Sequence, residues 1–408
     1  MTILRNLHPL IWNIIIGTMF GRMATAMSIP FLAIYLTNVK GVSSSETGMI
    51  IAVSSFIGIG SSFFGGYLSD RFGRKIVLYF SIFLSVAVFV GFGVVDSVVG
   101  FFVVNAMNGF SRSVFEPTSR ALLADLTVPE NRLVVFNLRY SAVNIGFIFG
   151  PILGYYLGSS KTTYPFFIAA GVYIIYGISL IITFRKFPIA SVIKSIKEER
   201  VTFLKAIKIV RTDSILLFSL IGLILATSGF SQFNSTLPQF LSNTTYIENG
   251  AKLFSILLTL NAIVVILTQY PLLKIGKKYS PILSIVLGNL ICSTSLIGFG
   301  FASSIPFWIV IVMVFTLGEV LMFSMTDMFM DSIAKPDLRG TYFGAMGFTQ
   351  IGSVVGPSLG GFLLDYFGYN NPLMVFGSLF ILSILGVPLL LTVKLKIKKE
   401  LTNEEGIK

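Results

Sequence analysis

Long apolar stretches, separated by short polar segments, follow one another along almost the whole sequence. A helix needs about 20 apolar residues to cross the roughly 30 Å hydrocarbon core of a bilayer. Because the stretches approach or exceed that length, we predict twelve membrane-spanning helices. The predicted spans lie near residues 10–36, 46–68, 76–95, 98–122, 134–157, 164–184, 213–241, 252–273, 281–302, 306–330, 340–364 and 371–393.

The composition narrows this interpretation. The chain has 408 residues, of which 54% are hydrophobic and only 12% are charged, with a mean hydropathy of +0.86. A soluble domain carries about 25% charged residues, so the sequence predicts an all-α polytopic membrane protein. The single cysteine, Cys292, lies inside an apolar stretch, which argues against a disulfide framework or a cysteine metal site. We expect no metal ion and no cofactor.

The net charge of +12 raises the question of a nucleic-acid partner. The cations, however, gather in alternate connections such as 71–75, 185–211 and 274–278, which is the distribution expected of cytoplasmic loops. This pattern predicts a multi-pass plasma-membrane protein with both termini in the cytoplasm. Membrane lipids are then the expected partners of the basic segments, and no nucleic acid is needed to explain the charge.

The longest connection between predicted spans is basic, and its apolar residues keep helical spacing. We predict an amphipathic helix that lies on the anionic inner leaflet and links two halves. The sequence leaves open whether this segment is a plain linker or a regulatory site. The predicted organisation is an N-terminal six-helix bundle at 1–188, the linker at 189–211, a C-terminal six-helix bundle at 212–396 and a cytoplasmic tail at 397–408.

The two predicted bundles share a glycine-proline pattern. Gly146-x-x-x-Gly150-Pro151-x-x-Gly154 recurs 206 residues later as Gly352-x-x-x-Gly356-Pro357-x-x-Gly360. Glycines permit close contact between helices, and a proline weakens the helical hydrogen-bond ladder so that a bend can form. Such a repeat favours two pseudo-symmetric halves with a substrate path between them. The alternative is a packing motif for any two membrane helices.

Several ionisable residues fall inside predicted spans. They are Arg22, Arg112, Glu116, Arg120, Arg139, Glu319 and Asp327. Each such charge costs roughly 3 kcal/mol when it faces lipid, so these side chains should face a hydrated cavity or one another. We treat them as a functional-site hypothesis.

Arg112, Glu116 and Arg120 recur every four residues, which aligns them on one helix face at intervals of ~6 Å. Arg139 returns at a similar depth in the next span, and Arg22 lies near the middle of the first. Two interpretations of Glu116 follow. It is either the centre of a fixed ion-pair network or a second proton-coupling residue.

Glu319 has no cation near it in the sequence. Desolvation without a counter-charge favours the protonated form of a carboxyl group, which suits a residue that loads and releases a proton. We predict that Glu319 is the proton-coupling carboxylate. The alternative is a buried acid that is simply hydrogen-bonded to a neighbouring helix.

A polar break between the second and third spans carries an ordered signature, Gly66-Tyr67-Leu68-Ser69-Asp70-Arg71-Phe72-Gly73-Arg74-Lys75. Such a segment should form a tight turn at the membrane surface. The order of residues resembles the signature between helices 2 and 3 of the major facilitator superfamily. The resemblance implies twelve helices in two six-helix halves and a cytoplasmic conformational latch. The implied latch residues are Gly66, Asp70, Arg71, Gly73, Arg74 and Asp125.

Two further segments resemble the twelve-span drug/proton antiporter branch of that superfamily. They are Thr316-Leu317-Gly318-Glu319 and Gln232-Phe233-Asn234-Ser235-Thr236-Leu237-Pro238. The Gly146-Gly150-Pro151-Gly154 pattern is similar to the fifth helix of such antiporters. The resemblance implies proton coupling and cation recognition at Glu319. Asn234 and Arg139 stand where some members have acids, which leaves the proton count and a preference for cationic drugs open.

We therefore expect a monomeric transporter that exports amphipathic small molecules in exchange for protons, as in multidrug efflux. The expected substrate cavity contains Arg22, Met23, Arg112, Arg139, Gln232, Phe233, Asn234 and Phe323. The alternative within the same fold is an exporter or importer of one metabolite, such as a siderophore, sugar or peptide. An enzyme is disfavoured by the single histidine and by the lack of a nucleophile or Gly-x-x-x-x-Gly-Lys-Ser/Thr motif. A receptor would not need two matched halves.

Overall fold

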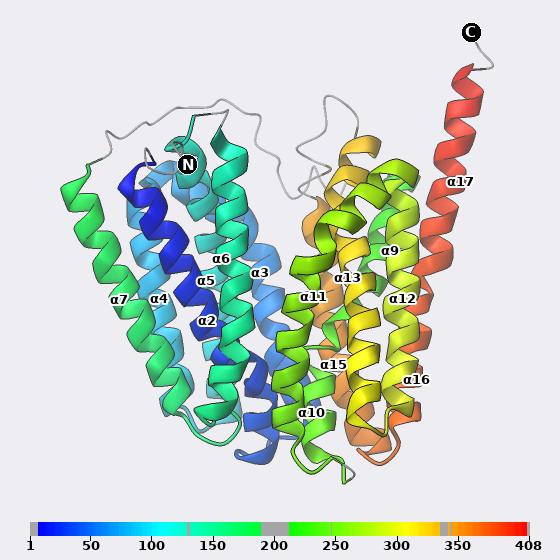
Figure 1. The fold of residues 1–408 in the computed structure, drawn as a ribbon, viewed down its shortest axis with the longest axis horizontal. Coiled ribbons are helices and arrows are strands. Elements are labelled where there is room, and N and C mark those ends of the chain that lie inside the picture. The colour runs from blue at the N-terminus through cyan, green and yellow to red at the C-terminus, as the bar shows by residue number, and fades with distance from the viewer. Residues whose placement is uncertain are drawn as a thin grey trace. The chain divides into compact units, whose positions relative to one another are not determined.

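The computed structural model describes residues 7–128, 131–188, 212–245, 247–334, 342 and 345–405. Within these ranges, the side chains of 62–67, 70, 132–133, 137, 273–279, 327, 331 and 400–405 are not described. All the regular elements in the described part of the chain are helices (Figure 1). The prediction of an all-α membrane fold is therefore confirmed. The predicted linker at 189–211 lies outside the described residues.

The chain divides into two compact units. The first unit comprises Met1–Lys197 with Phe254–Thr259, and the second comprises Glu198–Leu253 with Leu260–Lys408. The helices that begin and end in the first unit are α2 (Pro9–Asn38), α3 (Ser44–Phe72), α4 (Arg74–Val94), α5 (Val98–Asp125), α6 (Arg132–Tyr156) and α7 (Tyr164–Lys186). These six helices match the first six predicted spans.

The later elements are more divided than the sequence predicts. They are α9 (Ser214–Ser231), α10 (Thr236–Asn243), α11 (Gly250–Tyr279), α12 (Pro281–Phe301), α13 (Ile305–Ile333), η3 (Met346–Ile351), α15 (Gly352–Phe367), α16 (Pro372–Ile384) and α17 (Gly386–Glu405). Nine helical stretches of the described chain are long and apolar enough to cross a membrane, when Ser214–Asn243 and Pro372–Lys399 each count as one stretch.

Two predicted spans are each interrupted within the second unit, and a proline explains both breaks. A proline clashes with the carbonyl group four residues earlier and lacks the N–H that would bond to it. Pro238 disfavours continuous helix across Asn234, and α9 and α10 are separated there. Pro388 acts in the same way on Ile384, the last residue of α16. A smooth apolar profile does not reveal such breaks.

The predicted turn between the second and third spans is shorter than expected. Helix α3 continues through Phe72, and α4 begins at Arg74, so that only Gly73 connects them. Gly73 has a φ of 86°, in the left-handed region that favours glycine. One glycine therefore reverses the chain, and most of the signature segment lies in the last turns of α3.

In the first unit, glycines of α6 allow its backbone to approach α2 closely. A Cβ atom at Gly150 would lie 2.6 Å from the Cβ of Ala26 and 2.8 Å from the carbonyl oxygen of Met23. One turn earlier, a Cβ atom at Gly146 would lie 2.9 Å from the Cβ of Arg22. Only glycine fits at these spacings, so the repeated pattern fixes the position of the helix that carries Arg22.

The same arrangement occurs inside the second unit. A Cβ atom at Gly356 of α15 would lie 2.6 Å from the carbonyl oxygen of Ser228 on α9, and Gly352 also faces that helix, whereas Gly360 faces Gln232 and Thr236 just beyond it. The glycine-proline repeat thus packs one helix against another in the same way in both units.

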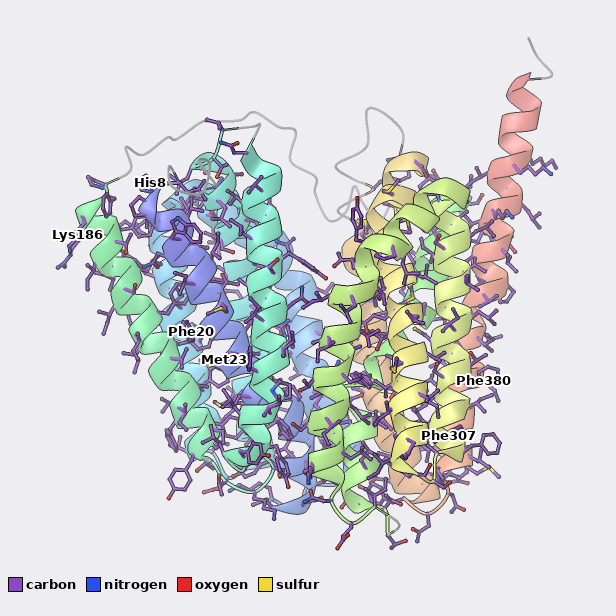
Figure 2. The ribbon with its side chains drawn as sticks, viewed as in Figure 1. His8, Phe20, Met23, Lys186, Phe307 and Phe380 are labelled. Atoms are coloured by element: carbon purple, nitrogen blue, oxygen red, sulfur yellow. The ribbon has the colours of Figure 1, made fainter. Side chains whose placement is uncertain are left out.

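Large apolar side chains are exposed on the outside of both units. Ile175 on α7 is 70% exposed and Leu267 on α11 is 68% exposed, and Phe307 on α13 projects outward in Figure 2. Water would penalise such a surface, whereas lipid chains solvate it. This surface is the one expected of a membrane-embedded protein.

Candidate functional site

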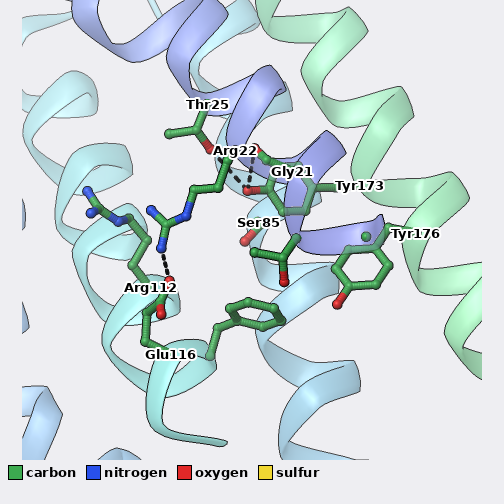
Figure 3. Close-up of a pocket in the computed structure, with 11 residues that line it drawn as sticks. Gly21, Arg22, Thr25, Ser85, Arg112, Glu116, Tyr173 and Tyr176 are labelled. Carbon is green, nitrogen blue, oxygen red and sulfur yellow. Dashed lines mark hydrogen bonds and ion pairs between the residues drawn. The ribbon is translucent and has the colours of Figure 1, made fainter. Parts of the chain in front are cut away.

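The centre of the candidate site in the first unit is Glu116 on α5. Its Oε1 forms an ion pair with Arg22 of α2, and its Oε2 accepts a hydrogen bond of 2.5 Å from Nη2 of Arg139 on α6. Arg120, one turn further along α5, lies 3.7 Å from the same Oε2. One carboxylate therefore joins three helices, and Figure 3 shows its pair with Arg22.

Burial distinguishes the members of this network. The exposed fraction of the side chain is 17% for Arg22, 22% for Glu116 and 9% for Arg139, but 63% for Arg120. Coulombic attraction is stronger where water is excluded, and an exposed pair contributes little. The Arg22–Glu116–Arg139 triad is thus the structural centre, and Arg120 is peripheral to it.

A small pocket adjoins the triad within the first unit. Its lining residues are Gly17, Thr18, Gly21, Arg22, Thr25, Ser85, Arg112, Phe115, Glu116, Tyr173 and Tyr176. The cavity volume is about 30 Å³, and on this measure one water molecule needs about 10–15 Å³. In this conformation the pocket can hold water or the head of a ligand, but not a whole drug-sized molecule.

One wall of the pocket is held by a closed set of hydrogen bonds. The Tyr173 hydroxyl on α7 donates to the carbonyl oxygen of Gly21 at 3.2 Å and lies 3.0 Å from Oγ1 of Thr25. Thr25 in turn donates to the same carbonyl group at 2.9 Å. These contacts fasten α7 to the part of α2 that carries Arg22.

Arg112 lines the same pocket one turn before Glu116 on α5. Unlike the other three arginines of the cluster, it makes no hydrogen bond or ion pair with any residue that the structure describes. Figure 3 shows the Arg22 and Arg112 guanidinium groups at the same side of the pocket. The sequence analysis places Arg22 and Arg112 in one cavity, but it does not predict that Arg112 lacks a partner.

Glu319 of α13, in the second unit, has a very different environment. Its Oε2 accepts a hydrogen bond of 2.7 Å from Nδ2 of Asn261 on α11, which also donates to Oγ1 of Thr316 at 2.9 Å. No cation among the described residues forms an ion pair with Glu319. The partner of this carboxyl group is therefore a neutral amide.

The other residues predicted for the cavity differ in their exposure. Gln232 is fully buried, where its Nε2 donates to the carbonyl oxygen of Ser228 at 2.9 Å. Phe233 is also buried and stacks on Phe315 with ring centroids 5.3 Å apart. Asn234 is exposed. Gln232 and Phe233 thus contribute to packing inside the second unit, which leaves Asn234 as the accessible member of that segment.

Two further predicted cavity residues, Phe323 and Met23, are partly accessible apolar side chains. Phe323 on α13 is 41% exposed and meets Phe230 edge to face, with centroids 4.8 Å apart. Met23 follows Arg22 on α2, where it is half-buried, and Phe20 is exposed on the same helix (Figure 2). Soft apolar side chains of this kind adapt to ligands of different shape.

Some of the predicted latch residues meet inside the first unit. Nε of Arg74, the first residue of α4, donates to Oδ2 of Asp125 at 3.2 Å, and its Nη1 donates to Oγ of Ser69 at 2.5 Å. Arg71 is exposed and lies over the Phe72 ring. The side chains of Gly66 and Asp70 lie outside those described, so their latch role stays a prediction.

Sequence reasoning missed several residues of both sites. Tyr173, Tyr176 and Thr25 line the first pocket, and Asn261 holds Glu319. Each is a polar side chain in an otherwise apolar span, which was a visible signal. This signal is weak because many hydroxyl groups in membrane helices donate only to a carbonyl group of their own helix. Thr268, for example, donates to the carbonyl oxygen of Val264.

Residues 14–350 match the family model described as Major Facilitator Superfamily. The chain is 48% identical over 402 residues to the uncharacterized MFS-type transporter YqjV of Bacillus subtilis (strain 168), which covers 98% of each chain. It is 28% identical over 356 residues to Multidrug resistance protein 1 of the same organism, covering 84% of this chain and 89% of that protein.

A solved structure shares the fold. A crystal structure of a variant of the nucleoside transporter NupG superposes with a TM-score of 0.82 and covers 94% of this chain and 99% of that one. The two sequences are 13% identical, so this likeness concerns the fold alone.

Proposed function

Because the chain belongs to the major facilitator superfamily, whose members are transporters and not enzymes, we propose that it exports amphipathic small molecules in exchange for protons. In this proposal it works as a monomer by alternating access in the plasma membrane, with both termini in the cytoplasm. The similarity to Multidrug resistance protein 1 supports a drug-exporting role. The chain would then be a member of the drug/proton antiporter branch.

The observation that carries the proposal is the contact between Glu319 and Asn261. A carboxylate accepts a hydrogen bond from the amide, and a protonated carboxyl group can keep that bond while its other oxygen carries the proton. Adding a proton therefore breaks no ion pair. A group with these properties can change its charge during a transport cycle.

Glu116 has the opposite properties. Its two oxygens receive Arg22 and Arg139, so protonation would leave two largely buried guanidinium groups without their counter-charge. We therefore assign the transported proton to Glu319 and a structural role to Glu116. In the cycle, a proton reaching Glu319 from outside promotes substrate release, and its loss to the cytoplasm permits the next substrate to bind.

The proposal is tested with purified protein in proteoliposomes that have an acidic lumen. Three fluorescent probes share one amphipathic scaffold and differ in charge: dansylglycine is an anion, dansylamide is neutral and dansylcadaverine is a cation. Protein-free vesicles measure passive accumulation. Wild-type protein should accumulate at least one probe in the lumen as protons leave.

The decisive variant is Glu319→Gln, with Glu248→Gln as its matched control because Glu248 is exposed in the loop before α11. Glu319→Gln should lose gradient-driven accumulation but still exchange labelled for unlabelled probe when no gradient is imposed. Glu248→Gln should behave as wild type in both assays. Gradient-driven accumulation at the wild-type level by Glu319→Gln would refute the assignment.

A further inference from the structure

The pocket beside Glu116 carries more positive charge than its carboxylate can neutralise. Among the residues that line the pocket, Arg22 and Arg112 are cations and Glu116 is the one acid, which leaves a net charge of +1. Both oxygens of Glu116 are already engaged by Arg22 and Arg139. Arg112 forms no ion pair with this acid among the described residues.

Arg112 is the unpaired member of the cluster. Its side chain is exposed, it lines the pocket, and no residue in the described part of the chain binds its guanidinium group. A guanidinium group presents five N–H donors in a planar fork that matches carboxylate, sulfonate and phosphate oxygens. At membrane depth such a group is expected to have a counter-ion.

A second, independent observation lies on the opposite wall. The hydroxyl groups of Thr18 and Tyr176 line the same pocket close to each other, are almost fully buried, and have no other hydrogen-bond partner among the described residues. Figure 3 shows Tyr176 facing the pocket from α7. Buried polar atoms are normally hydrogen-bonded, so these two hydroxyls are available as donors to a ligand oxygen.

We propose that this pocket recognises an oxyanion, and that the exported molecules are amphipathic organic anions whose carboxylate, sulfonate or phosphate head binds Arg112, with Thr18 and Tyr176 as neutral donors. This inference rests on the proposed export function and names its substrate class. The small pocket admits the head of such a molecule, and Phe115 adds an apolar side chain to its lining. Glu116 keeps Arg22 in place while Arg112 binds the ligand.

Equilibrium binding tests this directly. Full-length protein is reconstituted in phosphatidylcholine vesicles, and the fluorescence of dansylglycine, dansylamide and dansylcadaverine is titrated against empty vesicles. Dansylglycine should bind about 10- to 100-fold more tightly than the other two, which is the range expected for one charge-assisted contact. Equal binding of the three probes, preference for dansylcadaverine, or no binding of dansylglycine would overturn the proposal.

Arg112→Gln should abolish the preference for dansylglycine, and Arg185→Gln should leave it unchanged. Arg185 is an exposed arginine at the end of α7, so the control removes the same charge far from the pocket. Because Arg112 has no hydrogen bond or ion pair with a described residue, its replacement by glutamine breaks no such interaction and the variant should fold. Thr18→Val, which is nearly isosteric, provides a second variant and should weaken dansylglycine binding by about threefold to tenfold.

An anionic lipid headgroup has the same chemistry as the proposed ligand. The titration is therefore repeated in vesicles of equal parts phosphatidylcholine and phosphatidylglycerol. If the dansylglycine affinity is the same in both kinds of vesicle, the site binds a transported anion. If phosphatidylglycerol abolishes the Arg112-dependent binding of dansylglycine, the site binds lipid and the proposal is overturned.

Transport separates this inference from the proposed function. If dansylglycine binds through Arg112 but no pH gradient drives its movement, proton-coupled export fails and the anion site stands. If a pH gradient drives all three probes equally and Arg112→Gln has no effect, export stands and the anion site fails.

Discussion

Arg139 donates a hydrogen bond of 2.5 Å to the same carboxylate of Glu116 that forms an ion pair with Arg22. This relationship joins α2, α5 and α6 inside the first unit through one acidic side chain. It also explains why Arg22 and Arg139 can lie within membrane-spanning helices. Their positions are fixed by Glu116, and Arg112 remains the one available for a ligand.

Glu116→Gln should destabilise the protein more than any other single loss of charge in this cluster. The substitution leaves Arg22 and Arg139 without a counter-charge, and breaking a buried pair in this way costs about 3–5 kcal/mol. Partial exposure of Glu116 places the expected loss at the lower end. Thermal unfolding in detergent, followed by size-exclusion chromatography, measures the change.

The double variant Glu116→Gln/Arg139→Gln serves as the control for this prediction. Removing both partners should recover part of the lost stability, because the uncompensated charge at Arg139 is gone. A midpoint of Glu116→Gln equal to that of wild type would show that the triad contributes nothing to stability.

Gly150→Ala should destabilise the first unit by about 1–3 kcal/mol through overpacking. The added Cβ atom would lie 2.6 Å from the Cβ of Ala26, and neither helix backbone can yield without moving Arg22 on α2. The matched control is Gly171→Ala on α7, where the added atom meets nothing within 4 Å. Thermal unfolding should separate the two variants; equal midpoints would contradict the close packing of α2 and α6.

The ion pair between Lys40 and Asp96 connects two loops of the first unit and supports a prediction about pH. The hydrogen bond from the ammonium group to Asp96 raises the pKa of Lys40 above its usual 10.5. A raised lysine pKa stabilises the folded state at pH values below 10.5, and this contribution is lost as pH rises through the higher folded-state pKa.

Lys40→Met should therefore lower stability at neutral pH by less than about 1 kcal/mol, since Asp96 is largely exposed and water and salt screen the pair. The difference from wild type should shrink at high salt and at alkaline pH. Lys161→Met, in another exposed loop, is the control. A pH-independent difference in unfolding midpoint would indicate lost packing and not lost charge.

The hydrophobic pattern was sufficient to predict the fold class and the first six helices. It could not locate the breaks near Asn234 and Leu385, because these depend on where Pro238 and Pro388 meet a carbonyl group four residues earlier. A hydropathy profile averages over that detail. A proline alone does not predict an interruption either, because Pro30, Pro117 and Pro151 lie inside continuous helices.

The candidate sites were predictable in part. Helical spacing placed Arg112, Glu116 and Arg120 on one face, and depth suggested that Arg22 and Arg139 lie near them. Which arginine lacks a partner depends on the three-dimensional approach of α2 and α6, which Gly146 and Gly150 permit. Asn261 was missed because no local rule indicates which amide in a distant helix will meet Glu319.

The central claim, that Glu319 carries the transported proton, is tested most directly by recording proton movement. Proteoliposomes enclose the pH dye pyranine and begin without a pH gradient, and a probe gradient from the dansyl series is then imposed. We predict that inward probe movement drives protons out through wild type and Glu248→Gln, and that Glu319→Gln moves probe without protons. Proton movement through Glu319→Gln at the wild-type ratio to probe would contradict the account.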